Sequence, residues 1–121
     1  MANEMIEASC HCGAVRLRVN RAPEEVTDCN CTLCRRYGAL WAYYSPKDVQ
    51  VTNDATDIYK WGERIIEFHR CKQCGCITHW APVDKTYDRM AVNARLMTPE
   101  VLAHARLRHF DGANGWKYLD E

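Results

Sequence analysis

The amino-acid sequence predicts a single-domain, mostly β fold with zinc knuckles and one short helix near the C-terminus. Three observations predict it. Short segments along the chain have the residue patterns of strands. One segment, residues 98–105, has the features of a helix start. Eight cysteines fall into three closely spaced groups, which is typical of a metal-binding domain.

In the first half of the chain, one segment alternates polar and apolar residues with the period of two that sends successive side chains to opposite faces of a strand. Three further segments are rich in aromatic and β-branched residues, which favour strands. Turn signals at residues 45–48 and 53–54 separate the last three segments. The predicted strands are AVRLRV (14–19), WAYY (41–44), VQVT (49–52) and IYKW (58–61).

In the second half, a turn at residues 62–63 precedes three more segments with strand-like patterns. After the helix, a fourth segment returns as a strand and leads into the loop DGANG (111–115). These predicted strands are IIEFHR (65–70), ITHW (77–80), RMAVNARL (89–96) and RLRHF (106–110).

The predicted helix has favourable residues at its start. Thr98 is a suitable N-cap, and Pro99 suits the first helical position. Glu100 places a negative charge at the positive end of the helix dipole. The pattern lasts about two turns, so we expect a short helix.

Length and charge limit the classes of function. The chain has 121 residues, the size of one domain, which we place at residues 1–121. Lys plus Arg and Asp plus Glu each number 16, so the net charge is zero. The chain therefore lacks the overall basic charge that attracts nucleic acid, and we expect no nucleic-acid partner.

The sequence also indicates a cellular compartment. The stretch MANEMIEAS lacks the charged and apolar regions of a secretion signal, and no apolar run approaches the roughly 20 residues of a membrane span. We therefore expect a soluble, cytoplasmic protein with no membrane partner. In the reducing cytosol, eight cysteines favour metal binding. Disulfide pairing is the alternative if the chain is exported.

Two of the cysteine groups together are expected to form a structural zinc site. In CHCG, Cys10 and Cys12 at a strand end share one face and lie about 6.6 to 6.8 Å apart at Cα, so both sulfurs can reach one ion. In CKQCG, Cys71 and Cys74 form a tight knuckle in which Gly75 allows a backbone conformation that other residues resist. The four thiolates complete a tetrahedral zinc site.

The third group, in CNCTLCRR, leaves its fourth ligand open. Cys29, Cys31 and Cys34 are one ligand short of a closed tetrahedral zinc site. Either Cys76 or a histidine such as His11 completes a second structural site, or the fourth position is open to an external molecule, as in catalytic zinc sites. In both cases the sequence predicts two zinc ions per chain.

The cysteine groups, in this order, resemble the glutathione-dependent formaldehyde-activating enzyme family. The resemblance covers about residues 8–112 and is carried by CHCGAVRLRV, CNCTLCRR, FHRCKQCGC, RMAVNARL and FDG (110–112). It implies the β-tent fold and two zinc ions. The counterparts of Cys10, Cys12, Cys71 and Cys74 hold a structural zinc, and those of Cys29, Cys31 and Cys34 hold a second zinc thought to be catalytic. Cys76 stands where the family usually has an uncharged residue other than cysteine.

The resemblance also implies an activity. The enzyme that names the family is said to join formaldehyde to the thiol of glutathione as S-hydroxymethylglutathione, a carbon–sulfur bond-forming step classed with the lyases. We therefore expect a zinc-dependent carbon–sulfur lyase that acts on a small thiol and aldehyde adduct, such as that of glutathione and formaldehyde. The alternative is a non-catalytic zinc-binding module that binds another protein.

Several side chains near the third group are candidate substrate contacts. Arg35 follows Cys34 directly, and a guanidinium can bind a substrate carboxylate through two hydrogen bonds; a solvated surface charge is the alternative. Trp41, Tyr43 and Tyr44 either line a substrate pocket or pack in the core. No Ser-His-Asp order, Gly-rich phosphate loop or pair of carboxylates indicates a different chemistry.

Overall fold

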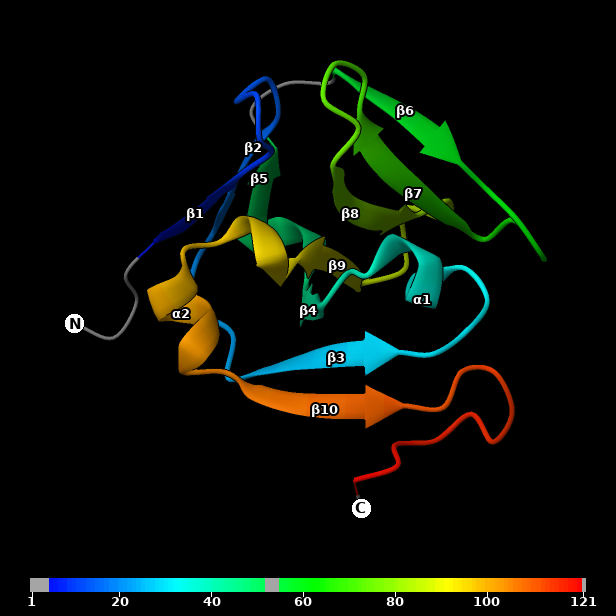
Figure 1. Cartoon of the computed structure of the whole chain (residues 1–121). Coiled ribbons are helices and arrows are strands. Elements are labelled where there is room, and N and C mark those ends of the chain that lie inside the picture. The colour runs from blue at the N-terminus through cyan, green and yellow to red at the C-terminus, as the bar shows by residue number, and fades with distance from the viewer. Residues whose placement is uncertain (1–4, 52–54, 121) are drawn as a thin grey trace.

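The computed structural model describes residues 5–51 and 55–120, which form a mostly β domain with two sheets (Figure 1). The smaller sheet is antiparallel and has the order β1–β2–β5. Its strands are β1 (Ile6–Ser9), β2 (Arg16–Val19) and β5 (Val49–Val51). The turn of the β1–β2 hairpin contains the CHCG segment, residues 10–13.

The larger sheet has the order β10–β3–β4–β9–β8–β7–β6 within the described ranges. β10 pairs with β3 in parallel, and the other pairs are antiparallel. Its strands are β3 (Glu25–Cys29), β4 (Trp41–Tyr44), β6 (Thr56–Tyr59), β7 (Ile66–Cys71), β8 (Ile77–Pro82), β9 (Met90–Asn93) and β10 (Arg106–Phe110). Figure 1 shows β3 and β10 side by side at one end of this sheet, with α1 directly after β3.

Short helical segments connect the strands. They are α1 (Cys34–Tyr37), η1 (Pro46–Asp48), η2 (Ala94–Leu96) and α2 (Pro99–Ala103). Helix α2 confirms the predicted helix near the C-terminus, because the Thr98 hydroxyl caps it by accepting a hydrogen bond from the Val101 N–H at 3.4 Å. Nowhere in residues 5–51 and 55–120 is there a helix with the length and apolar character that crossing a bilayer requires.

The middle of the larger sheet is buried on both faces. Along β4, Ala42 and Tyr44 join one core cluster, whereas Trp41 joins a second cluster on the opposite face. Strand β9 is buried at all four of its residues, as expected for a strand that is covered on both sides. This arrangement explains why WAYY has no polar face.

The two core clusters separate the cysteine groups. Cys10 and Cys71 belong to the cluster that includes buried residues of the small sheet, such as Leu17. Cys34 belongs to the other cluster, with Trp41 and other aromatic side chains. The fold therefore places two groups of sulfurs in different packing environments.

The predicted segments agree with the structure to different degrees. WAYY and RLRHF have the same bounds as β4 and β10. Strand β6 lies two residues earlier than IYKW, because the chain turns at Gly62 and Arg64, which have φ values of +62° and +60°. In VQVT, residues 49–51 form β5, whereas Thr52 and the predicted turn at residues 53–54 lie outside the described residues.

The prediction of one strand over residues 89–96 is wrong at its C-terminal end. The strand ends at Asn93, whose side-chain oxygen accepts a hydrogen bond from the Arg95 N–H at 3.1 Å and starts η2. Three elements have no counterpart among the predicted segments: β1, β3 and α1. Each is only four or five residues long, and none contains the run of aromatic residues that indicated a strand in the equally short WAYY.

Candidate metal centres

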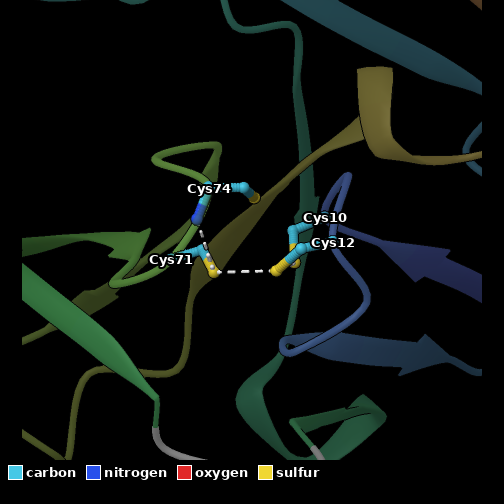
Figure 2. A group of neighbouring side chains, drawn as sticks. All are labelled: Cys10, Cys12, Cys71 and Cys74. Atoms are coloured by element: carbon cyan, nitrogen blue, oxygen red, sulfur yellow. Dashed lines mark hydrogen bonds between the residues drawn. The ribbon is translucent and has the colours of Figure 1, made fainter.

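The structure brings Cys10, Cys12, Cys71 and Cys74 together in one group, here called the four-cysteine cluster. All four sulfurs lie within 4.8 Å of one another. Cys10 Sγ and Cys12 Sγ are 3.7 Å apart, and Cys12 Sγ and Cys71 Sγ are 3.6 Å apart. Figure 2 shows the pairs facing each other from two segments, the turn after β1 and the loop that begins at the end of β7.

The first half of this cluster is a turn. Strand β1 ends at Ser9, so Cys10 and Cys12 lie beyond it and do not follow the strand geometry that the sequence suggests for a CxC pair. The turn is closed by the Gly13 N–H, which donates to the Cys10 carbonyl at 3.2 Å, and Gly13 has a φ of +84°. It is therefore this turn, and not the alternation of a strand, that brings the Cys10 and Cys12 sulfurs together.

The second half has the expected knuckle geometry. Gly75 adopts a φ of +81°, and its N–H donates to the Cys71 carbonyl at 3.0 Å. The backbone N–H groups of Gln73 and Cys74 point at Cys71 Sγ, at 3.4 and 3.5 Å. Backbone donors of this kind stabilise a thiolate.

The four sulfurs influence one another's ionisation. Backbone N–H groups of Cys76 and Cys12 lower the pKa of Cys74 to about 5. For Cys12, the N–H of Ala14 lowers the pKa, but desolvation and the neighbouring sulfurs outweigh it and raise the pKa to about 11. Neighbouring thiolates repel each other, and a divalent cation would allow all of them to ionise.

Cys29, Cys31 and Cys34 form the second group, here called the three-cysteine cluster, with sulfurs within 4.8 Å of one another. Cys29 ends β3, Cys31 lies in the following turn, and Cys34 begins α1. Helix α1 is held by the cluster itself, because the Cys34 N–H donates to Cys31 Sγ at 3.2 Å. Cys34 is buried, and the other two are partly buried.

Two residues outside the CNCTLCRR segment, Trp41 and Gly112, complete the surroundings of the three-cysteine cluster. The indole Nε1–H of Trp41 donates to Cys34 Sγ at 3.4 Å. The Gly112 N–H donates to Cys29, and a Cβ at position 112 would lie 2.7 Å from Cys29 Sγ. The FDG segment therefore requires glycine at this position because the sulfur occupies the space of a side chain.

The protons of the three-cysteine cluster are unevenly shared. The Cys34 thiol donates to Cys29, which, together with backbone N–H groups, lowers the pKa of Cys29 to about 6. The same contact and burial raise the pKa of Cys34, and the Trp41 indole acts in the opposite direction. One sulfur of the cluster is thus ready to bind a cation at neutral pH.

The structure separates Cys76 and His11 from the three-cysteine cluster. Among the described residues, no fourth Cys, His, Asp or Glu side chain joins this cluster. Cys76 instead lies beside the four-cysteine cluster, where its carbonyl accepts a hydrogen bond from the Cys71 N–H at 2.9 Å. The backbone N–H of His11 donates to the Cys76 sulfur, in the same region.

Both groups fit zinc by their donor chemistry. All eight cysteines are described, and none forms a disulfide. Sulfurs bound tetrahedrally at about 2.3 Å from a zinc ion lie about 3.8 Å apart. The 3.6 and 3.7 Å separations in the four-cysteine cluster agree with that spacing. Groups of thiolates select soft or borderline metal ions, of which zinc is the redox-inert one.

The other candidate contacts have different surroundings. Arg35 is exposed on α1, one residue after Cys34, and its guanidinium has no ion pair within the described part of the chain. Trp41 and Tyr44 are 1% and 4% exposed, so they are core residues. Tyr43 is partly buried, and the Arg89 guanidinium lies 4.1 Å from the centre of its ring.

Tyr43 packs against the core cluster that contains Cys34, together with Cys29 and Cys31. Burial raises the pKa of Tyr43 to about 12, and Tyr118, Cys29 and Cys34 act in the same direction. The phenol therefore stays protonated at neutral pH. From the sequence, Tyr43 was either a pocket residue or a core residue. The sequence of the strand does not show which side chains pack beside the sulfurs.

A stacked pair of histidines lies apart from the three-cysteine cluster. The His69 and His79 rings are 4.2 Å apart and nearly parallel. They belong to β7 and β8 and are opposite each other in the register. Burial, with a smaller effect of His69, lowers the pKa of His79 to about 3. These histidines pack in the sheet and do not complete either cysteine cluster.

Comparisons with known proteins agree with the sequence motifs. A family model described as "Glutathione-dependent formaldehyde-activating enzyme" matches residues 5–110. Among solved structures, the crystal structure of a Rhodobacter sphaeroides protein is similar, with a TM-score of 0.70 and 27% sequence identity. The match covers 84% of this chain and 99% of that one. No curated protein matches this chain.

Proposed function

The chain belongs to the glutathione-dependent formaldehyde-activating enzyme family, and from this we propose that it is a zinc-dependent carbon–sulfur lyase that joins a small thiol, such as glutathione, to formaldehyde. One observation carries the proposal: the three-cysteine cluster has no fourth protein ligand among the described residues. A zinc with three protein ligands and one exchangeable position is typical of catalytic sites.

The four-cysteine cluster has a different role in this proposal. Its four sulfurs hold a structural zinc that ties the β1–β2 turn to the knuckle after β7, about sixty residues away. A structural zinc of this kind contributes about 10 to 16 kcal/mol of binding free energy to folding. A domain of 121 residues is stable by only about 6 to 18 kcal/mol, so the fold depends on this ion.

The reaction needs a thiolate at neutral pH. Zinc at the three-cysteine cluster supplies the positive charge that lowers the pKa of a substrate thiol. The thiolate sulfur attacks the carbon of formaldehyde, a carbon–sulfur bond forms, and the carbonyl electron pair moves to oxygen. The thiol releases its proton to solvent when the thiolate forms, and the oxygen takes one proton back from solvent, which gives the S-hydroxymethyl thioether with no net change in protons. The reverse sequence releases thiol and aldehyde.

The chain supplies groups that suit an anionic thiol. Arg35 lies one residue from Cys34 and is exposed, so its guanidinium can bind a glutathione carboxylate without losing an existing ion pair in the described structure. Tyr43 packs against the same core cluster as the three cysteines, and its phenol is protonated, so it can donate a hydrogen bond to an oxygen. Both roles belong to the proposal.

Exchange spectroscopy tests this function, because formaldehyde and glutathione also combine without a catalyst. The rate of exchange between free and thiol-bound ¹³C-formaldehyde is measured by NMR with zinc-loaded protein at several concentrations. We expect the rate to rise in proportion to wild-type protein and to stay at the background value with Cys31→Ser. Equal rates with both proteins would reject the enzyme and favour the non-catalytic module.

A further inference from the structure

Each sulfur of the three-cysteine cluster accepts an N–H hydrogen bond, but the donors differ in kind. Cys31 Sγ accepts from the Cys34 backbone at 3.2 Å, and Cys29 accepts from backbone N–H groups, including that of Gly112. Cys34 Sγ accepts from the indole Nε1–H of Trp41 at 3.4 Å. Cys34 is therefore the sulfur of this cluster whose N–H donor can be removed by changing one side chain.

The indole is held in this position by its packing. Trp41 is 1% exposed, and its ring centre lies 6.0 Å from that of Phe68. Its backbone pairs with Asn93 on β9 and with Thr27 on β3. An indole N–H can only donate, and in this buried place it has Cys34 as its acceptor. The contact is therefore a fixed feature of the fold.

We propose that Trp41 is a positioning residue that protects the Cys34 sulfur from the aldehyde substrate. This inference rests on the proposed function, in which an electrophilic aldehyde reaches a site made of thiolates. A hydrogen bond to a thiolate draws charge from the sulfur and makes it a poorer nucleophile. The indole N–H donates to Cys34 and not to the substrate, so it does not reduce the nucleophilicity of the substrate's sulfur.

The side reaction that Trp41 prevents would damage the site. The Cys34 sulfur would attack the aldehyde carbon and form a carbon–sulfur bond, the carbonyl electron pair would move to oxygen, and that oxygen would take a proton from water. The product is a neutral thioether in place of a thiolate. Loss of one negative charge from a group of three sulfurs would weaken its hold on a divalent cation.

Selective alkylation tests the inference without any turnover measurement. Zinc-loaded wild type, Trp41→Phe and Trp80→Phe are treated with iodoacetamide, and the modified cysteines are identified over time by mass spectrometry. Trp80 is the matched control, because it is buried in the same core cluster and makes no hydrogen bond to a cysteine in the described structure. We expect Cys34 to be alkylated about fivefold faster in Trp41→Phe than in wild type, which is the effect of one lost hydrogen bond. In Trp80→Phe the rate at Cys34 should equal that of wild type.

Two outcomes of the alkylation would overturn the proposal. One is an unchanged rate at Cys34 in Trp41→Phe. The other is equal acceleration at all three cysteines or in Trp80→Phe, which would show general loosening. If Trp41→Phe does not fold, 3-benzothienylalanine at position 41 keeps the bicyclic shape and removes only the N–H.

A second measurement uses the unmodified sequence. In protein loaded with ¹¹³Cd, the Trp41 indole proton should show a scalar coupling to the metal through Cys34 Sγ, and absence of the coupling would overturn the inference. Neither measurement uses formaldehyde and glutathione. The exchange rates therefore test the proposed function, and the alkylation rates and the metal coupling test the role of Trp41 separately.

Discussion

Gly112 offers a sharp test of the three-cysteine cluster, because one methyl group would enter the space of the Cys29 sulfur. In Gly112→Ala the new Cβ would lie 2.7 Å from Cys29 Sγ and 3.3 Å from Cys31 Cβ. Ordinary contact begins at about 3.5 Å, so the sulfur or the loop must move by roughly 0.8 Å. Metal–ligand distances tolerate only about 0.2 Å. We therefore expect zinc affinity at this cluster to fall about 10- to 100-fold.

The assay compares metal affinity and folding in the same samples. Zinc affinity is measured by competition with a chromogenic chelator, and stability by thermal melting monitored by circular dichroism. Gly115→Ala is the matched control in the same loop, because the atoms nearest to its Cβ belong to Asp111 and Lys117 and not to a cysteine, and the nearest of them lies at 3.2 Å. Overpacking at Gly112 costs about 1 to 3 kcal/mol, so the variant should remain folded. Two zinc ions held with wild-type affinity in Gly112→Ala would refute the reasoning.

Three further predictions concern the two clusters, the substrate contact and pH. Cys71→Ser should be unfolded or insoluble, whereas Cys31→Ser should fold and lose one zinc; equal collapse in a thermal melt would contradict the separate roles. Arg35→Lys should weaken thiol binding about tenfold in titration calorimetry at unchanged zinc content, since one bidentate contact contributes about 1.5 to 3 kcal/mol. Unchanged affinity would show that Arg35 is a solvated surface residue that does not contact the thiol. The pKa of His79 is about 3 when folded, below its ordinary 6.5, so the unfolded chain binds the extra proton and stability falls as pH drops below about 6.5. In urea melts, His79→Gln should reduce that slope by up to about 1.4 kcal/mol per pH unit, and an unchanged slope would show that His79 does not contribute.

Cysteine spacing predicted the grouping of sulfurs because it depends on short-range geometry. The CxxCG knuckle needs only a tight turn with a left-handed glycine, and Gly75 supplies it with a φ of +81°. The partner of this knuckle, CHCG, could be recognised by its residues but not by its conformation. It forms a turn beyond β1, because a four-residue strand ends before Cys10.

The surroundings of the three-cysteine cluster could not be predicted from the sequence. The Trp41 indole and the Gly112 backbone reach Cys34 and Cys29 through tertiary packing, 7 and 83 residues away in the chain. The parallel pairing of β10 with β3, which places Phe110 opposite Cys29, brings the FDG loop to the cluster. Such a pairing depends on the whole fold and has no local signal in either segment.

The number of zinc ions per chain tests the account most directly, because the proposed function depends on two occupied clusters with separate roles. Elemental analysis is carried out on protein purified without added metal, with Cys31→Ser prepared in the same way. The account predicts two zinc ions per wild-type chain and one in the variant. One zinc in the wild type, unchanged in Cys31→Ser, would contradict it and leave the three-cysteine cluster without a metal-dependent role.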